Sequence, residues 1–345
     1  MPIKKGADRV NINKRRVING EDADVVQLSP MKHEWAWEYY NAANANHWLP
    51  TEISMQLDIE QWKSETALTL EERQAFETVL GFFTTADSLA ANNVVLANYK
   101  HITSPEVRMY MLRQGYEEAI HTHAYQYIVE SLSMDEGKIF NMYREIDSIY
   151  EKADFFLAFS EGIFNDDFKT GTFENDQKYL ENLCIFALIV EGIFFYSSFA
   201  VMFGFKRQNK LVGSAEQIEY IMRDESMHLN FGCKLINTIK EEQPELWTQE
   251  FQDKIVGHIV QATKLEYTFA QEVFPKGIFG MNAEGFKQYI EFIADRRLER
   301  VGLPPQNEGV TNPFPWMSEA IDISKEKNFF ETRVTEYQVG GALDW

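Results

Sequence analysis

The chain has 345 residues, enough for one large domain or two of ordinary size and for a substantial buried core. Its composition, 45% hydrophobic and 14% aromatic, excludes an intrinsically disordered chain. The net charge of -20 argues against nucleic acid or an acidic membrane as a partner, because either would be repelled over most of the surface.

Two cysteines, Cys184 and Cys233, are too few for a disulfide framework or a CxxC-type thiolate metal site, so we expect a reducing, cytoplasmic location. Residues 1–16 are basic but no apolar run follows them, which predicts no secretory signal. Residues 184–205 are long and apolar enough to span a membrane, but Glu191 lies inside this segment. We therefore predict a core helix that carries one inward-facing carboxylate, and no membrane contact.

Residues 1–30 are predicted to form an N-terminal extension, and residues 31–302 a helical domain. Beyond residue 50 the pattern of this domain predicts one helix after another. The first long helix should begin at Thr69, where the sequence TLEE has the form of a capping box, and its apolar stripe passes through Asp87. A second helix should open at Ser104, a cap residue followed by proline, and end near residue 130. The fold is therefore predicted to be all-α.

Two further long helices are predicted, one over about residues 178–206 and one that begins at a second capping box, residues 214–217. The second and fourth helices share a pattern of buried positions at alternating three- and four-residue steps. On the second helix these are Val107, Met111, Gln114, Glu118, His121, Tyr125 and Ile128, and on the fourth Ile218, Ile221, Glu225, His228, Gly232, Leu235 and Ile239.

Shorter helices are expected in residues 132–172, 244–275 and 282–302, packed around the four long ones. From residue 303 the helical pattern ends, and the chain finishes in a segment with glycines and scattered aromatic residues. We predict that residues 303–345 form a C-terminal segment with a flexible, partner-binding tail.

Each half of the predicted bundle places a lone carboxylate on one helix and a Glu-x-x-His pair on the next. Residues three apart on a helix project from one face, so each pair presents an oxygen and a nitrogen ligand together. The two sets are Asp87 with Glu118 and His121, and Glu191 with Glu225 and His228.

Burying four carboxylates in apolar faces is prohibitively costly unless positive charge pairs with them, and no Lys or Arg lies on these faces. Two metal ions would supply that charge, and four carboxylates with two imidazoles suit iron or manganese. The same arrangement defines ferritin-like dinuclear carboxylate proteins. A single Glu-x-x-His is usually a chance pattern on a surface helix, but two of them on buried faces favour a metal site.

Tyr125 lies one helical turn after His121 on the same face, beside the predicted metals. A tyrosine on an inward face is most often ordinary core, but next to an oxidising centre it is a candidate for a tyrosyl radical shielded from water. Phe195, Phe199 and Ile221 are predicted either to shield Tyr125 from water or simply to pack the core. His123 points to a different side of the helix and is assigned no metal role, and Glu117 lies next to a ligand without sharing the inward face.

The chain resembles the small subunit of class I ribonucleotide reductase over essentially its whole length. The resemblance rests on EEAIHTHAY, MRDESMHLNFG, HWLPTEI, VEGIFFYSSF, ADRRLERVGL, NPFPWMSE and the tyrosine-bearing tail. It implies a ferritin-like bundle and six metal ligands: Asp87, Glu118, His121, Glu191, Glu225 and His228.

The resemblance also implies a route for the oxidising equivalent from Tyr125, the radical position, to a large subunit that reduces ribonucleotides. Asp224 would orient His121, Trp48 would lie beyond it, and Tyr337 would carry the radical across the subunit interface. The last residues would dock on the large subunit, and a homodimer is expected.

In overall sequence the chain resembles the branch of this family whose members often carry Phe at the radical position and use a manganese/iron centre. Because Tyr125 occupies that position here, we favour Fe/Fe, with Mn/Fe and Mn/Mn left open. The alternatives of another class are a stand-alone di-iron oxidase or oxygenase and an iron-storage or structural bundle. Neither has a use for Trp48 and Tyr337, which argues against both.

Overall fold

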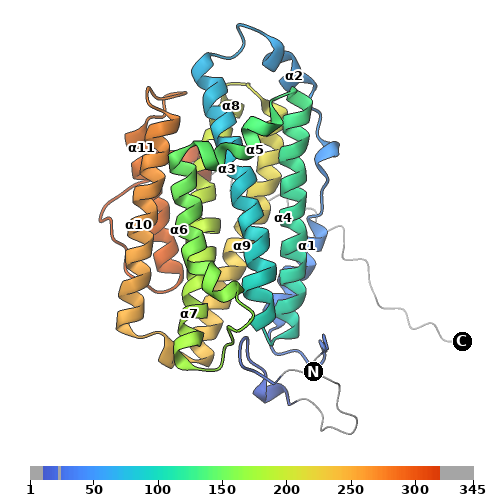
Figure 1. Ribbon diagram of the computed structural model, residues 1–345, viewed down its shortest axis with the longest axis vertical. Helices are drawn as coiled ribbons and strands as arrows, with labels where there is room; N and C mark the ends of the chain where they lie inside the picture. The colour runs from blue at the N-terminus through green and yellow to red at the C-terminus, as the bar shows by residue number, and fades with distance from the viewer. Residues whose placement is uncertain (1–10, 22–24, 319–345) are drawn as a thin grey trace, which may run out of the picture.

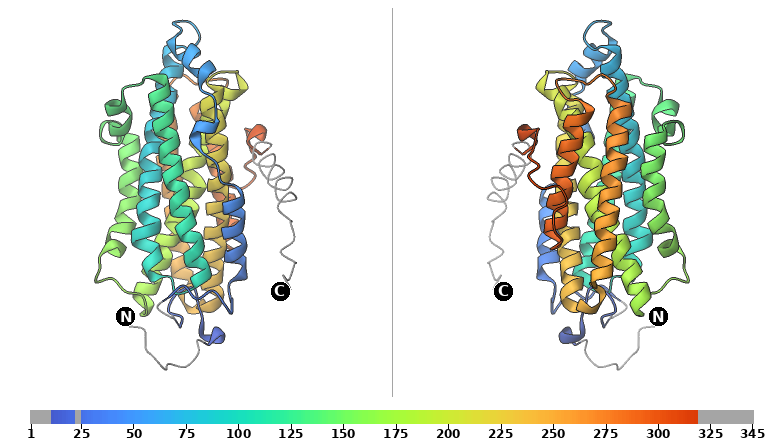
Figure 2. Two further views of the ribbon diagram at one scale, coloured as in Figure 1. Left: turned by 90° about the vertical axis from the view of Figure 1, so that its right-hand side faces the viewer. Right: turned by 90° about the vertical axis from the view of Figure 1, so that its left-hand side faces the viewer.

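The computed structural model describes residues 11–21 and 25–318, and these form a bundle of long, roughly parallel or antiparallel helices (Figure 1; Figure 2). Within this part of the chain the only β-structure is two isolated bridges, so the all-α prediction is confirmed. The α-helices are α1 Glu34–Ala45, α2 Gln56–Lys63, α3 Leu70–Asn92, α4 Pro105–Leu132, α5 Glu136–Glu145, α6 Asp147–Phe164, α7 Phe173–Cys184, α8 Phe195–Arg207, α9 Val212–Glu242, α10 Gln249–Val273 and α11 Ala283–Arg300.

The first two predicted helix starts are confirmed. Thr69 accepts from the backbone N–H of Glu72, whose side chain accepts in return from the backbone of Thr69, so α3 begins with a true capping box. Ser104 caps α4, with Pro105 at its first position. Helix α1, in contrast, was not predicted, because only Ala36 and Ala43 of it are buried and its apolar periodicity is weak.

The predicted capping box at residues 214–217 is wrong, because α9 begins two residues earlier, at Val212. Its first amides are capped from elsewhere in the chain: the buried carboxylate of Asp58, on α2, accepts from the backbone N–H groups of Gly213 (2.9 Å) and Ser214 (2.7 Å). The Ser214 hydroxyl also donates to Asp58 (2.7 Å). The cap is therefore a long-range contact, which a local motif cannot reveal.

The third predicted helix is continuous in the structure but not uniformly α-helical. Helix α7 passes into a π-helical segment, η5 (Ile185–Phe194), and then into α8. A second π-helical segment, η3 (Asn93–Asn98), extends α3. Two stretches, Leu70–His101 and Phe173–Arg207, are long and apolar enough to cross a membrane by length and composition, but the apolar window of the second is 100% buried within the protein. This burial is what we expect of a core helix.

Part of the predicted N-terminal extension packs on the bundle. The backbone N–H of Val17 donates to Glu242 (2.7 Å), and Ile18 forms a bridge with Ile102. Arg15 is almost fully buried and its guanidinium donates to the backbone oxygens of Gln27 and Pro30. These contacts fasten the N-terminal segment to α9 and to the loop before α4.

A buried ion pair ties the outer helices α6 and α10 to the core. Lys152 on α6 pairs with Glu266 on α10, and Ser197 on α8 donates a hydrogen bond to the same carboxylate. Both charged side chains are at most 1% exposed, and the ammonium nitrogen lies 3.4 Å from the ring centre of Phe82. Burial lowers the pKa of Lys152 to about 8 although Glu266 opposes this shift. The pair is therefore held at a desolvation cost.

We expect Lys152→Met to lower the free energy of unfolding by about 3–5 kcal/mol, because it leaves the carboxylate of Glu266 buried without its positively charged partner. Chemical denaturation of the metal-free protein followed by circular dichroism would measure this loss. The double variant Lys152→Met, Glu266→Leu should recover most of it. A single variant as stable as the parent protein would contradict the assignment of a desolvated charge pair.

Candidate metal centre

The six side chains singled out from the sequence converge from four parts of the bundle. Asp87 comes from α3, Glu118 and His121 from α4, Glu191 from η5, and Glu225 and His228 from α9. Five of the six are 0% exposed and His228 is 2% exposed. Chain segments far apart in sequence thus place a polar cluster in the interior of the bundle.

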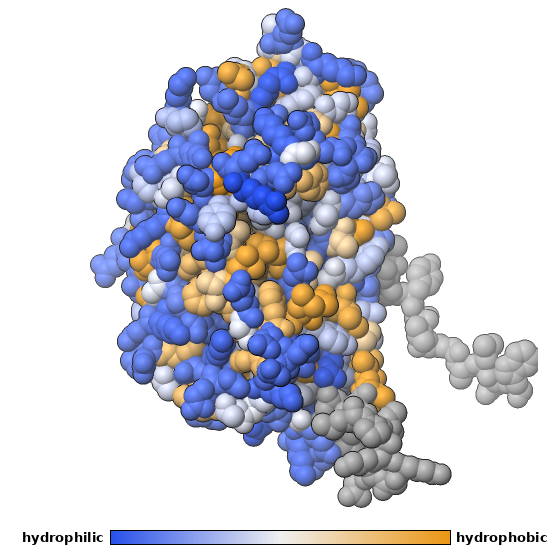
Figure 3. Space-filling view, in the orientation of Figure 1, coloured by the Kyte–Doolittle hydropathy of each residue, from blue (hydrophilic) through white to orange (hydrophobic). Residues whose placement is uncertain are grey.

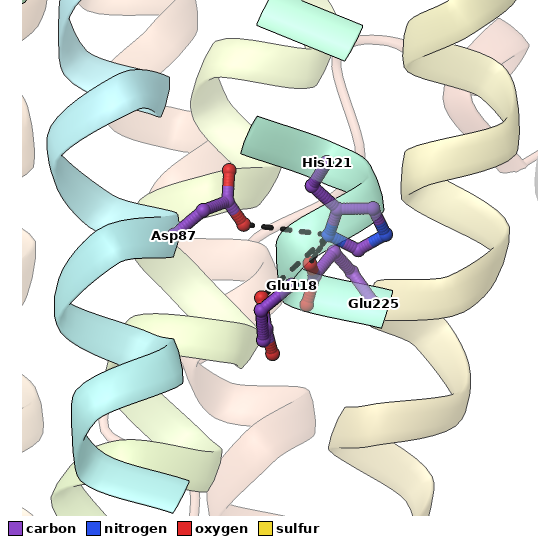
Figure 4. A group of neighbouring side chains, drawn as sticks. All are labelled: Asp87, Glu118, His121 and Glu225. Atoms are coloured by element: carbon purple, nitrogen blue, oxygen red, sulfur yellow. Dashed lines mark ion pairs between the residues drawn. The ribbon is translucent and has the colours of Figure 1, made fainter. Parts of the chain in front are cut away.

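The cluster divides into two groups of potential ligands that overlap. In each group, one ligand atom from every residue lies within 4.8 Å of the others. One group is Asp87, Glu118, His121 and Glu225, drawn in Figure 4, and the other is Glu118, Glu191, Glu225 and His228. Glu118 and Glu225 belong to both groups, so their carboxylates lie where two neighbouring cations could share them.

Each histidine turns its Nδ1 toward the carboxylates. His121 Nδ1 lies 2.9 Å from Glu225 and 3.4 Å from Asp87, and Figure 4 shows these side chains pointing toward one another. His228 Nδ1 lies 3.0 Å from Glu225 and 3.4 Å from Glu118. The two imidazoles therefore face the same carboxylates from two sides.

The opposite nitrogen of each imidazole meets a second acid. His121 Nε2 lies 3.3 Å from Asp224, which also accepts a hydrogen bond from the Trp48 indole (2.8 Å). The contacts expected among Trp48, Asp224 and His121 are thus present. Such an outer acid fixes the orientation of an imidazole and increases its basicity as a ligand. The far face of Trp48 stacks on Tyr220, at 5.2 Å between ring centres.

The equivalent acid behind the other histidine is Glu117, which was not assigned a role from the sequence. Its carboxylate lies 3.0 Å from His228 Nε2, and it is 2% exposed. The helical-wheel argument placed Glu117 off the inward face of its own helix, but its side chain reaches across to α9. A signal was present in the sequence, because each shared glutamate directly follows an acid: Glu117 precedes Glu118, and Asp224 precedes Glu225.

An arginine accompanies each outer acid and also binds the end of α1. Arg113 lies 3.2 Å from Glu117 and donates to the carbonyl of Ala43 (3.0 Å). Arg223 lies 3.2 Å from Asp224 and donates to the carbonyl of Asn46. Each of the two acid–histidine pairs is therefore anchored, through its arginine, to residues 43–46, just before Trp48.

The electrostatics of the cluster favour a bound cation. Burial, followed by the charge of Glu225, raises the pKa of Glu118 to about 8 and raises that of Glu191 well above its usual value. Burial opposes charge on His121, but its contacts with Asp224 and Asp87 outweigh this and raise its pKa. The raised pKa values of Glu118 and Glu191 reflect burial and mutual repulsion, which a bound cation would offset.

Unpaired polar atoms lead to the same conclusion. Both carboxylate oxygens of Asp87, both of Glu118 and Oε2 of Glu191 are buried without a hydrogen-bond partner in the described part of the chain. Gln114 donates to the other oxygen of Glu191 (3.3 Å). Buried carboxylate oxygens are rarely left unpaired unless they bind a metal, so the residues fit a pair of divalent or trivalent cations.

Tyr125 is 0% exposed, and its hydroxyl has no hydrogen-bond partner among the described residues. Burial raises the pKa of Tyr125 well above its usual value, and the neighbouring charge of Asp87 raises it further. The ring lies parallel to Phe83, at 5.6 Å between centres and 2° between planes. Phe83 in turn packs on Phe195 and Phe199. Phe83, one helical turn before Asp87 on α3, is therefore the ring that lies against Tyr125.

The remaining predicted residues are placed as follows. His123, which was given no metal role, is exposed, and Ile221 is fully buried. Tyr337 lies outside the described residues, as does the tail after residue 318. Its predicted role therefore stays a prediction.

Comparisons with known proteins decide the family. The sequence model of the family described as "Ribonucleotide reductase, small chain" matches residues 25–313. The chain belongs to the ribonucleotide reductase small-chain family. Among curated relatives, it is 51% identical to the ribonucleoside-diphosphate reductase subunit beta of Chlamydia pneumoniae over 98% of this chain and 97% of that protein. It is 31% identical to the small chain of Plasmodium falciparum over 99% of this chain and 90% of that protein.

A solved structure agrees with this assignment. The ribonucleotide reductase R2 subunit from Clostridium botulinum superposes with a TM-score of 0.83 at 27% identity, covering 93% of this chain and 98% of that chain. The ferritin-like fold is therefore confirmed. As a member of the small-chain family, the protein is the radical-generating subunit of a ribonucleotide reductase and carries a dinuclear metal site, and a stand-alone oxidase is not favoured.

Proposed function

We propose that Asp87 and His121 hold one metal ion, Glu191 and His228 hold the second, and Glu118 and Glu225 bridge the two. The observation that supports this proposal is the overlap of two four-residue groups in two shared carboxylates. When bound, such a pair supplies the activation of oxygen and the one-electron oxidising power that a radical-generating subunit needs. The oxygen-rich ligand set suits iron or manganese, and Fe/Fe is favoured because a tyrosine occupies position 125.

Tyr125 is the residue proposed to be oxidised to the radical. Tyr125 is fully buried, so its oxidation to a neutral radical requires a nearby acceptor for the phenolic proton as well as for the electron. Asp87 is the carboxylate whose charge acts most strongly on the phenol, and it is the proposed proton acceptor. Phe83, Phe195 and Phe199 exclude water from the far side of the ring, which would lengthen the lifetime of the radical.

The proposed exit for the oxidising equivalent runs from His121 through Asp224 to Trp48. The 3.3 Å contact between His121 and Asp224 and the 2.8 Å hydrogen bond from Trp48 to Asp224 support this route, since each joins a proton donor to an acceptor. Tyr337 would then pass the radical to the large subunit, on which the last residues of the 303–345 segment would dock. The names of the curated relatives support a ribonucleoside diphosphate as the substrate that the large subunit reduces. A cytoplasmic location is proposed with this function.

An exposed apolar patch supports the proposed homodimer. Val95 and Leu96 of η3 and Leu112 and Tyr116 of α4 are 46–55% exposed. The two helices pack together here, because a Cβ atom on Gly115 of α4 would lie 3.6 Å from Val95 of η3. Figure 3 shows hydrophobic residues gathered around the middle of the face on which α3, α4 and α6 lie. We assign this face to contact with a second copy, since exposed apolar patches commonly mark interfaces.

Tyr125→Phe tests the radical assignment directly. We expect the oxygen-activated parent protein to give a tyrosyl signal in electron paramagnetic resonance, and we expect the variant to give none while it still binds two metal ions. The variant ring keeps the contact with Phe83, so folding should be unaffected. A metal-centred signal that is the same in both proteins would instead indicate a manganese/iron centre that stores the oxidising equivalent itself.

A further inference from the structure

The carboxylate of Glu191 projects from the π-helical segment η5, not from an ordinary α-helix. A π-helical turn bonds each N–H to the carbonyl five residues back, as Phe195 does with Val190, and so it contains one more residue than an α-turn. The direction of every side chain in the segment depends on where this extra residue is accommodated. The orientation of Glu191 therefore depends on what holds η5 in its π-helical form.

One side of η5 is held by an arginine from α11. Arg297 Nε donates to the carbonyl oxygen of Gly192, the residue after Glu191, at 2.8 Å. The Arg297 side chain is 6% exposed, and its guanidinium lies 4.6 Å from the ring centre of Tyr196. A buried guanidinium that donates to a backbone carbonyl forms a charge-assisted hydrogen bond, which is stronger than a neutral one.

Gly192 leaves room for this contact. A Cβ atom on Gly192 would lie 3.2 Å from both Cδ and Nε of Arg297 and 3.1 Å from the carbonyl oxygen of Ala187. On the other side of η5, a Cβ atom on Gly232 of α9 would lie 2.4 Å from the Cβ atom of Ala187. Two glycines thus allow α9 and α11 to approach η5 closely from two directions.

We propose that Arg297 is a positioning residue for the metal centre: through the carbonyl of Gly192 it fixes the π-helical turn that directs Glu191 toward the second metal ion. The inference rests on the metal ligands proposed above. Only the group that contains Glu191 and His228 depends on this turn, because the other group draws its ligands from α3, α4 and α9. Gln114 also binds Glu191 directly, so loss of Arg297 should loosen the carboxylate without releasing it.

The test is a titration of metal-free protein with Mn²⁺, in which the signal of free aqueous Mn²⁺ in electron paramagnetic resonance reports binding. Arg297→Gln should leave the first equivalent bound as tightly as in the parent protein. The affinity for the second should fall by about 10- to 100-fold, the usual cost of losing a residue that orients a ligand. Backbone amides of η5 should also exchange faster with solvent in this variant.

Arg296→Gln is the matched control. Arg296 is the neighbouring residue on α11, and together with Arg297 it lines a concavity on the protein surface. Its guanidinium, however, lies over the ring of Phe292, 5.5 Å from the ring centre. This variant should bind both equivalents normally. Gly192→Ala disturbs the same contact at the residue that accepts the hydrogen bond. It should reproduce the selective loss of affinity for the second equivalent even if Arg297→Gln does not fold.

The double variant Gly192→Ala, Arg297→Gln should be no worse than the more affected single variant, because both changes break one contact. Normal binding of two equivalents by Arg297→Gln, or by Gly192→Ala if the former does not fold, would overturn the inference. Equal weakening of both equivalents would also overturn it, since that result indicates a general structural role. A parent protein that fails to bind two Mn²⁺ ions would instead refute the proposed metal site.

Discussion

Glu225→Ala is expected to abolish tight binding of both metal ions, whereas Asp87→Ala is expected to abolish binding of one. The reason is that Glu225 belongs to both ligand groups and Asp87 to only one. The loss of affinity in Glu225→Ala should exceed the roughly 10- to 100-fold caused by removing a residue that merely orients a ligand. Glu118→Ala should behave like Glu225→Ala, since Glu118 is the other shared carboxylate.

Metal content after equilibration with Fe²⁺ under anaerobic conditions would measure these effects. His123→Ala is a suitable control, because His123 lies two residues from His121 but is exposed. Circular dichroism should show that each variant keeps its helices. Retention of two tightly bound ions by Glu225→Ala would refute the assignment of Glu225 as a ligand that both ions share.

Removal of the tail after residue 328 is expected to abolish turnover with the large subunit while both metal ions still bind. The reason is that all six proposed ligands lie in the helical bundle, whereas Tyr337 and the proposed docking segment lie in the tail. Turnover with purified large subunit and metal content of the same preparation would be measured together. The truncated protein should also still give the tyrosyl signal, because Tyr125 is untouched.

Tyr337→Phe separates the two roles proposed for the tail. This variant keeps the docking segment, so it should still bind the large subunit and compete with the parent protein for it. It should nevertheless fail to support turnover, since phenylalanine cannot take part in proton-coupled transfer. Normal turnover in either the truncated protein or Tyr337→Phe would remove the proposed exit route.

The sequence was sufficient for the parts of the site that follow from helical periodicity. Glu118, His121, Glu225 and His228 share faces because residues three apart always do, whatever surrounds the helix. The starts of α3 and α4 were equally predictable, since their caps are made by residues next to them. Local rules of this kind need no knowledge of the tertiary structure.

The features that were missed depend on contacts between distant segments. Glu117 reaches His228, which is 111 residues away in the chain, and Asp58 caps a helix that begins more than 150 residues later. The π-helical form of η5 depends on packing against α9 and α11. No periodicity in one segment can specify such contacts, although the acid before each shared glutamate was a usable clue.

The anchoring of Arg113 and Arg223 to the last turn of α1 has a mechanical consequence. The carbonyls of Ala43 and Asn46 are only three residues apart, yet through the two arginines they connect to Glu117 and Asp224, behind the two imidazoles. A shift of this single turn would therefore change the basicity of both histidines at the same time. The orientation of the two imidazoles is thus tied to one short stretch of chain, although the two histidines lie on different helices.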